Sequence, residues 1–230
     1  EVNFHFIEAN SWQYSFYVPQ DVQTHISMLG GDEKYTSKLD EQFNASNKTT
    51  GRTQVDITGL IGQYAHGNEP SHHAAYLYNF AGKPWKTQET VRKIMKTLYS
   101  NAPDGLCGND DCGQMSAWYV LSAAGFYPVT PGTTDYILGS PIFRKVIFHL
   151  ENGKSFTIVA QNCDEKNLYI HSATINGAPY SKSYITHNQI IEGSTLNLEM
   201  KNIPSANFGV SISDRPITKI NQNKEIVMNP

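Results

Sequence analysis

Two adjacent carboxylates, Asp110 and Asp111, lie in a glycine-bounded segment whose residue types suit chemistry better than packing. The segment, residues 105–118, has the sequence GLCGNDDCGQMSAW and leads directly into an apolar helical pattern. Adjacent carboxylates repel each other, so they require water, a cation or hydrogen-bond donors around them. A solvated turn that caps a helix is the alternative, because Asp and Asn favour the N-cap position. The other motifs of the chain help to decide between a loop that presents acids for chemistry and a solvated turn that caps a helix.

A third acid, Glu8, stands in the segment IEANSWQYSF, close in sequence to Trp12 and Tyr14. Burial in partly apolar surroundings would favour its protonated form and suit it to general acid catalysis. The alternative is an exposed glutamate near the end of the chain. Together with Asp110 or Asp111, Glu8 would complete the pair of carboxylates that glycoside hydrolysis requires.

Residues 63–73, QYAHGNEPSHH, concentrate polar side chains in one short stretch. Oxygen atoms from Asn68 and Glu69 would suit calcium, which binds carboxylate, amide and backbone oxygens. A polar turn with Ser71 as a helix N-cap is the plain alternative. Zinc is another, although the histidine spacing differs from the i, i+4 pair of common zinc helices. A zinc hydrolase would use three histidines: His66, His72 and His73.

The composition of the 230-residue chain restricts the class of protein. Hydrophobic residues make up 39% and the formal net charge is −3, so the chain is globular and has no electrostatic attraction to nucleic acid or to an anionic membrane. Three cysteines do not predict a disulfide framework. No apolar run reaches membrane-spanning length, and no signal-peptide pattern is visible at the start of the chain.

Periodicity divides the chain near residue 130 into a helical segment, residues 1–130, and a β-rich segment, residues 131–230. We expect α+β architecture, with an antiparallel β-sandwich in the second segment. Helices are predicted over residues 21–29, 33–43, 72–80, 86–99 and 114–124. Strands are predicted over residues 145–150, 155–160, 168–173, 189–191 and 195–200.

Several long motifs, in order along the chain, closely resemble glycoside hydrolase family 92, the calcium-dependent exo-acting α-mannosidases. The resemblance spans roughly residues 4–210. Its runs are EANSWQYSF, GQYAHGNEPSHHAAYLYN, KTQETVRKIMKTLY, GLCGNDDCGQMSAWYVLSAAGFYPVTPG and YILGSPIFRKV. The resemblance implies an inverting hydrolysis of terminal α-mannosidic linkages in mannose-containing glycans, of the α-1,2 type in mannose-rich glycans.

The resemblance also implies roles for particular residues. Glu8 is expected as the general acid, and Asp111, with Asp110 as its partner, as the general base. Calcium is expected to contact the mannose O2 and O3 and to favour a distorted ring. Its expected ligands are Asn68, Glu69 and Gln63, and the expected substrate contacts are Trp12, Gln13, His66 and Asp104.

The family's catalytic unit resembles an N-terminal β-sandwich followed by an (α/α)6 barrel, which is larger than this chain. We therefore expect the last part of the barrel plus closing β structure, with the upstream part of the same enzyme as partner. A secreted, periplasmic or cell-surface location is implied. A non-catalytic carbohydrate-binding module is the competing hypothesis, but it would leave Glu8, Glu69, Asp110 and Asp111 without a role.

Overall fold

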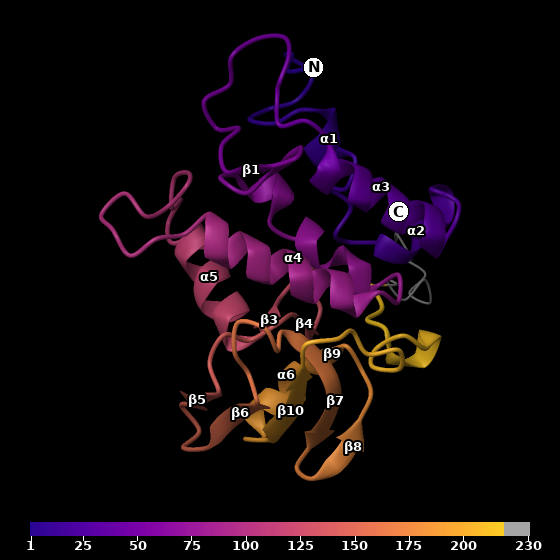
Figure 1. The fold of residues 1–230 in the computed structure, drawn as a ribbon, viewed down its shortest axis with the longest axis vertical. Helices are drawn as coiled ribbons and strands as arrows, with labels where there is room; N and C mark the ends of the chain where they lie inside the picture. Colours follow the sequence, from indigo (N-terminus) through magenta and orange to yellow (C-terminus); the bar gives the residue numbers. More distant parts are fainter. Residues whose placement is uncertain (219–230) are drawn as a thin grey trace, which may run out of the picture.

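A helical portion is followed by a β-rich portion in the computed structural model, which describes residues 1–218 (Figure 1). The α-helices of the first portion are α1 (Ser11–Tyr14), α2 (Val22–Met28), α3 (Asp32–Asn44), α4 (Pro84–Thr97) and α5 (Gln114–Ala124). Local sequence explains their ends. Pro84 opens α4 at the first turn, where its missing N–H costs nothing, and α5 lies between Gly113 and Gly125, both left-handed.

Two 3₁₀ segments, η1 (Glu69–Ser71) and η2 (Ala74–Asn79), connect the short hairpin β1 (Leu60–Ile61) and β2 (Tyr64–Ala65) to α4. The prediction of an amphipathic α-helix over residues 72–80 is therefore wrong. Every side chain of η2 is buried, so this segment has no polar face and passes through the interior of the helical portion. The other four predicted helices are present with shifts of a few residues at their ends.

The β-rich portion contains two sheets. The larger has the order β5-β6-β10-β7-β8, and the smaller has the order β3-β4-β9. The strands are β3 (Phe126–Tyr127), β4 (Asp135–Leu138), β5 (Lys145–His149), β6 (Ser155–Gln161), β7 (Tyr169–Ile175), β8 (Ala178–Tyr180), β9 (Tyr184–Thr186) and β10 (Thr195–Lys201). Their alternating burial, clearest along β6 and β10, places one face of the larger sheet on the core.

Two sequence predictions about this portion are wrong. The larger sheet is mixed, because β10 pairs parallel to β6 and antiparallel to β7. Residues 189–191 belong to α6 (His187–Ile191) and not to a strand. Thr186 explains the helix, since its side chain accepts a hydrogen bond from the Gln189 backbone N–H while the Gln189 side chain accepts one from the Thr186 N–H, a capping box. The last element described is η3 (Ile212–Asp214).

The helical and β-rich portions share a packed boundary, because α4 lies between the N-terminal helices and the sheets (Figure 1). The Gln88 side chain of α4 accepts a hydrogen bond of 3.1 Å from the backbone N–H of Ile170 in β7. Val129 and Ile137, on either side of residue 130, belong to the same buried cluster. The domain boundary at residue 130 stays a prediction.

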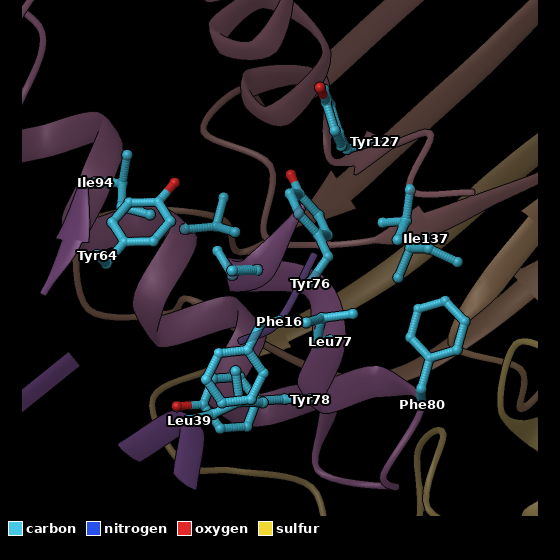
Figure 2. Close-up of a cluster of buried hydrophobic side chains, with 14 of the residues drawn as sticks. Phe16, Leu39, Tyr64, Tyr76, Leu77, Tyr78, Phe80, Ile94, Tyr127 and Ile137 are labelled. Carbon is cyan, nitrogen blue, oxygen red and sulfur yellow. The ribbon is translucent and has the colours of Figure 1, made fainter. Parts of the chain in front are cut away.

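An aromatic-rich cluster forms the core of the helical portion, with Phe16, Tyr64, Tyr76 and Tyr78 among its buried members (Figure 2). Trp118 belongs to the same cluster. His73 lies in this core next to η2, and its Nε2 is 2.7 Å from the carbonyl oxygen of Phe16, to which it donates. Burial lowers the pKa of His73 to about 4, against the raising effect of that hydrogen bond. The folded protein therefore holds this imidazole neutral.

We expect the free energy of unfolding to fall as the pH decreases below about 6.5. Between that pH and about 4, the unfolded chain binds a proton on His73 and the folded chain does not. This one residue removes up to about 1.4 kcal/mol per pH unit over that window and has no effect above it. Urea unfolding at several pH values should show that the free energy of unfolding depends less steeply on pH in His73→Gln than in the wild type. Replacing the exposed His149 by Gln is the control, and equal slopes for all three proteins would contradict the prediction.

Candidate active site

Glycines bring the segment around Asn68 and the acidic loop of residues 105–113 into backbone contact. A Cβ added to Gly108 would lie 2.4 Å from the carbonyl oxygen of Gly67, and one added to Gly67 would lie 1.9 Å from Oγ1 of Thr58. Neither position has room for a side chain. The loop between α4 and α5, which projects from the helical portion in Figure 1, is therefore fixed against the segment that carries Asn68 and Glu69.

The structure distinguishes the two adjacent aspartates. Asp110 is committed to the start of α5: its Oδ1 accepts a hydrogen bond of 2.9 Å from the Ser116 backbone N–H, and its Oδ2 one of 3.0 Å from the Ser116 hydroxyl. Asp111 is exposed and its carboxylate accepts no hydrogen bond from the described residues. Burial lowers the pKa of His72, and the negative charge of Asp111 opposes that lowering. Asp110 thus caps the helix, whereas Asp111 is available for chemistry.

Glu8 contacts the same segment through Asn68. The Asn68 side-chain amide donates to the Glu8 carbonyl oxygen at 3.1 Å and to its carboxylate Oε2 at 3.2 Å. Residues 1–218 leave Glu8 exposed, so the expected apolar surroundings are not formed by the described part of the chain. Because Asn68 follows Gly67, Glu8 and the acidic loop contact adjacent residues of one short segment.

Backbone strain marks both of these acids. Glu8 has φ of 59° and Asp111 has φ of 45°, in the left-handed region that residues other than glycine seldom adopt. Cys112 and Gly113 continue the positive φ after Asp111, which turns the chain sharply into α5. Strain of this kind costs about 1–3 kcal/mol per residue and is concentrated at functional sites.

Asn68 and Glu69 fit part of the calcium site expected of them. Glu69 is half-buried and forms no ion pair with any described residue, so its carboxylate is not neutralised within the protein. The Asn68 Oδ1 accepts only a 3.2 Å contact from the backbone N–H of Glu69. Both are hard oxygen donors, but calcium takes six to eight such ligands. Within residues 1–218 these two supply a fraction of a full coordination shell.

Three of the predicted site residues are occupied by other interactions. Gln63 is buried; its Oε1 accepts from Asn10 at 3.2 Å and its amide donates to the Ser46 and Lys48 carbonyls. Gln13 is also buried and completes the capping box of α1 with Asn10. His66 is 0% exposed. Its two ring nitrogens lie 2.7 Å and 2.6 Å from the hydroxyls of Tyr64 and Tyr99. These side chains support the segments that carry the site.

Trp12 and Asp104 lie closer to solvent. Trp12 is half-buried in α1, four residues after Glu8 in the sequence. Asp104 is exposed in the turn that closes with the Gly105 N–H donating to the Ala102 carbonyl. Their contact with a substrate stays a prediction. The zinc site of the alternative interpretation, with His66, His72 and His73 as ligands, is not formed by the described residues. Residues 1–218 contain no group of three His, Cys, Asp or Glu side chains placed to hold a metal ion.

A hydrogen-bond network around Gln114 was missed by the sequence analysis. The Gln114 side-chain amide lies 3.2 Å from His72 Nδ1 and 2.9 Å from the Tyr127 hydroxyl. His72 Nε2 is 2.9 Å from the His66 carbonyl oxygen, and Trp118 donates to the His72 carbonyl at 3.0 Å. The position of Gln114, three residues after Asp111, was the available signal. Its partners lie 42 and 13 residues away and only folding shows them.

Comparison with known proteins identifies the family to which this chain belongs, a class of carbohydrate-cleaving enzymes. Residues 1–202 match the glycosyl hydrolase family 92 catalytic domain. The chain therefore belongs to glycosyl hydrolase family 92. A curated relative from Arthroderma benhamiae, named an uncharacterized secreted glycosidase, is 32% identical over 212 residues, covering 91% of this chain and 25% of the relative.

Solved structures from Bacteroides thetaiotaomicron are also similar. A family GH92 α-mannosidase in complex with mannoimidazole matches with 43% identity and a TM-score of 0.84, over 90% of this chain and 27% of that one. A family GH92 inverting mannosidase matches with 38% identity and a TM-score of 0.82, over 94% of this chain and 30% of that one. The chain thus spans between a quarter and a third of the length of these relatives. It carries part of the fold of the family's catalytic domain.

Proposed function

We propose that this chain is part of an inverting exo-α-mannosidase that hydrolyses terminal α-mannosidic linkages, of the α-1,2 type in mannose-rich glycans. The observation that supports the proposal is that one short segment, which holds Asn68 and Glu69, contacts both Glu8, through the Asn68 amide, and the loop that carries Asp111, through the close approach of Gly67 and Gly108. The solved relatives are described as α-mannosidases, one of them bound to mannoimidazole and another as inverting.

In the proposed reaction, Glu8 donates its proton to the glycosidic oxygen as the bond from that oxygen to the anomeric carbon breaks. Asp111 accepts a proton from a water molecule, whose oxygen forms the new bond to the opposite face of the same carbon. The two carboxyl groups of an inverting pair stand about 6.5–9.5 Å apart, which leaves room for this water. Configuration at the anomeric carbon is inverted because attack and departure occur on opposite faces.

The Asn68 side chain has a defined part in this proposal. Its amide group donates to the Glu8 carboxylate, while its Oδ1 faces the Glu69 backbone N–H, so it fixes the acid relative to the next segment. Asn68 and Glu69 would hold a calcium ion, which as a Lewis acid would orient the sugar hydroxyls and favour ring distortion. Other ligands would come from water, substrate or the remaining part of the enzyme.

The proposed partner within the enzyme is its upstream part, and the proposed location is secreted, periplasmic or at the cell surface, as the name of the fungal relative suggests. Among residues 1–218, no helix has the length and apolar character needed to cross a membrane. The test of the function is an assay with an aryl α-mannoside, on this chain and on the full-length protein, in calcium and then in chelator. Mannose released first as the β-anomer, followed by NMR, would support inversion. Release of the α-anomer would overturn it.

Calcium binding has its own prediction. We expect Glu69→Gln to weaken calcium binding at least tenfold, because the neutral amide lacks the charge that favours a divalent cation. Isothermal titration calorimetry of the full-length protein measures this. Glu33→Gln is the control, since Glu33 lies on α3 and pairs with Lys83 at 2.6 Å, remote in sequence from the proposed ligands. Zinc binding without calcium affinity, or an unchanged calcium affinity in Glu69→Gln, would contradict the assignment.

A further inference from the structure

The backbone conformation of Glu8 requires a restraint from outside the residue itself. Its φ of 59° is in the left-handed region, which is unfavourable for residues other than glycine. Such a conformation persists only where the surrounding structure fixes it. The Glu8 side chain is exposed among the described residues, so its own packing does not supply that restraint. The source is therefore to be sought in the hydrogen bonds of the adjacent peptide groups.

Two consecutive carbonyl groups at this turn each accept a hydrogen bond from a side chain. The Tyr14 hydroxyl donates to the Ile7 carbonyl oxygen at 3.0 Å. The Asn68 amide donates to the Glu8 carbonyl oxygen at 3.1 Å. These carbonyls belong to the two peptide groups on either side of the Glu8 Cα. Because each peptide group is planar, fixing the orientation of both restrains φ and ψ of Glu8 together.

Both donors are themselves held in place. Asn68 is buried, with 5% of its surface exposed. Tyr14 is the last residue of α1, and this short helix is anchored by the buried Gln13, whose side-chain amide donates to the Gln63 carbonyl. The Tyr14 ring also stacks on Phe6, with centroids 5.2 Å apart. The Tyr14 hydroxyl therefore has a defined position from which to hold the turn.

We propose that Tyr14 is a positioning residue for the general acid: its hydroxyl fixes the peptide group before Glu8 and thereby the direction of the Glu8 carboxyl group. This inference rests on the general-acid role proposed for Glu8. Proton transfer requires the acid to be within hydrogen-bond reach of the glycosidic oxygen, and a displacement of about 1 Å costs up to about 10²-fold in rate. Tyr14 transfers no proton in this role and acts only through Glu8.

The test removes the Tyr14 hydroxyl and keeps the ring with its stacking on Phe6. We expect Tyr14→Phe in the full-length protein to lower kcat/KM roughly tenfold for a mannobioside and less than about twofold for an activated aryl mannoside. The two substrates differ because a sugar leaving group needs the proton of Glu8 and an activated phenol does not. The ratio of the two losses is the readout, since a change confined to the fold would lower both values alike.

Tyr17→Phe is the matched control. Tyr17 follows α1 closely, its ring packs edge-on against Tyr14, and 47% of its surface is exposed. Its hydroxyl forms no hydrogen bond among residues 1–218, so this variant loses the same atom without releasing the turn. Its kcat/KM should equal that of the wild type for both substrates.

A double-mutant cycle with Glu8→Gln separates positioning from a structural role. If Tyr14 acts through the acid, adding Tyr14→Phe to Glu8→Gln should change kcat/KM for the mannobioside by less than about twofold, because no proton is left to position. A hydroxyl that served only the fold would instead reduce activity by the same factor in both backgrounds. Urea unfolding of each variant gives the folded fraction, so that the kcat/KM values refer to folded protein.

The outcomes separate this inference from the function on which it rests. If Glu8→Gln loses activity mainly on the mannobioside while Tyr14→Phe behaves like Tyr17→Phe, the positioning role is wrong and Glu8 remains the acid. Equal losses of Tyr14→Phe on both substrates, or the same loss with and without Glu8→Gln, would also overturn it. If Glu8→Gln slows both substrates equally, Glu8 is not the general acid, and the role of Tyr14 fails with it.

Discussion

Replacing Glu8 by Gln is expected to lower kcat/KM about 10²- to 10⁴-fold for a mannobioside, because the amide cannot transfer a proton to the departing sugar oxygen. An activated aryl mannoside, such as the 2,4-dinitrophenyl compound, departs without protonation and should lose roughly tenfold or less. The shape of the side chain is kept, and the Asn68 amide still finds an oxygen acceptor at this position. The measurement is the loss of kcat/KM for the mannobioside divided by the loss for the aryl mannoside, both in the full-length protein.

Asn68→Ala is an informative companion to this variant. It removes the donor to the Glu8 carboxylate, which is 3.2 Å away, and leaves the acid itself in place. We expect a smaller loss of kcat/KM than in Glu8→Gln, and this loss should again be larger for the mannobioside than for the activated aryl mannoside. If Glu8→Gln slows both substrates equally, with its circular dichroism unchanged, Glu8 is not the general acid. The acid would then lie in another part of the enzyme.

Much of the helical portion could be predicted from the sequence because its helices carry local signals. Pro84 at the start of α4 and the glycines on both sides of α5 mark these ends directly. Residues 72–80 misled the prediction, since apolar spacing does not distinguish a half-exposed helix from a buried 3₁₀ segment. The prediction of a strand over residues 189–191 is wrong for a related reason. Three residues are too short a window, and the capping box of Thr186 and Gln189 decided the local structure.

Local sequence patterns could not predict which strands pair with each other. Alternating burial along β6 and β10 was readable, but the parallel register of these two strands depends on contacts between residues 157–161 and 195–199. Sequence motifs named polar residues for the site without distinguishing exposed side chains from buried ones. Gln13, Gln63 and His66 are buried and hydrogen-bonded to other protein groups, whereas Glu8 and Asp111 are exposed, and only the folded structure separates these two sets.

The two adjacent aspartates provide the sharpest test of the proposed site, because Asp110 is hydrogen-bonded to Ser116 and Asp111 is exposed. Asp111→Asn should lower kcat/KM about 10²- to 10⁴-fold, since water activation is needed whatever the leaving group, and both substrate types should lose activity alike. Asn tolerates the positive φ of 45° at this position, so the free energy of unfolding should change by less than about 0.5 kcal/mol.

Asp110→Ala should lower the stability of the protein more than Asp111→Asn does, and its activity less. It removes two hydrogen bonds to Ser116 at the start of α5, of 2.9 and 3.0 Å, and should cost about 1 kcal/mol of stability, as loss of a helix cap does. Its activity should fall less than that of Asp111→Asn, and Ser116→Ala should reproduce part of the stability loss. Urea unfolding and steady-state kinetics on both variants decide the matter. Should Asp110→Asn abolish activity while Asp111→Asn, equally well folded, stays near the wild type, the general base would be Asp110 and not its exposed neighbour.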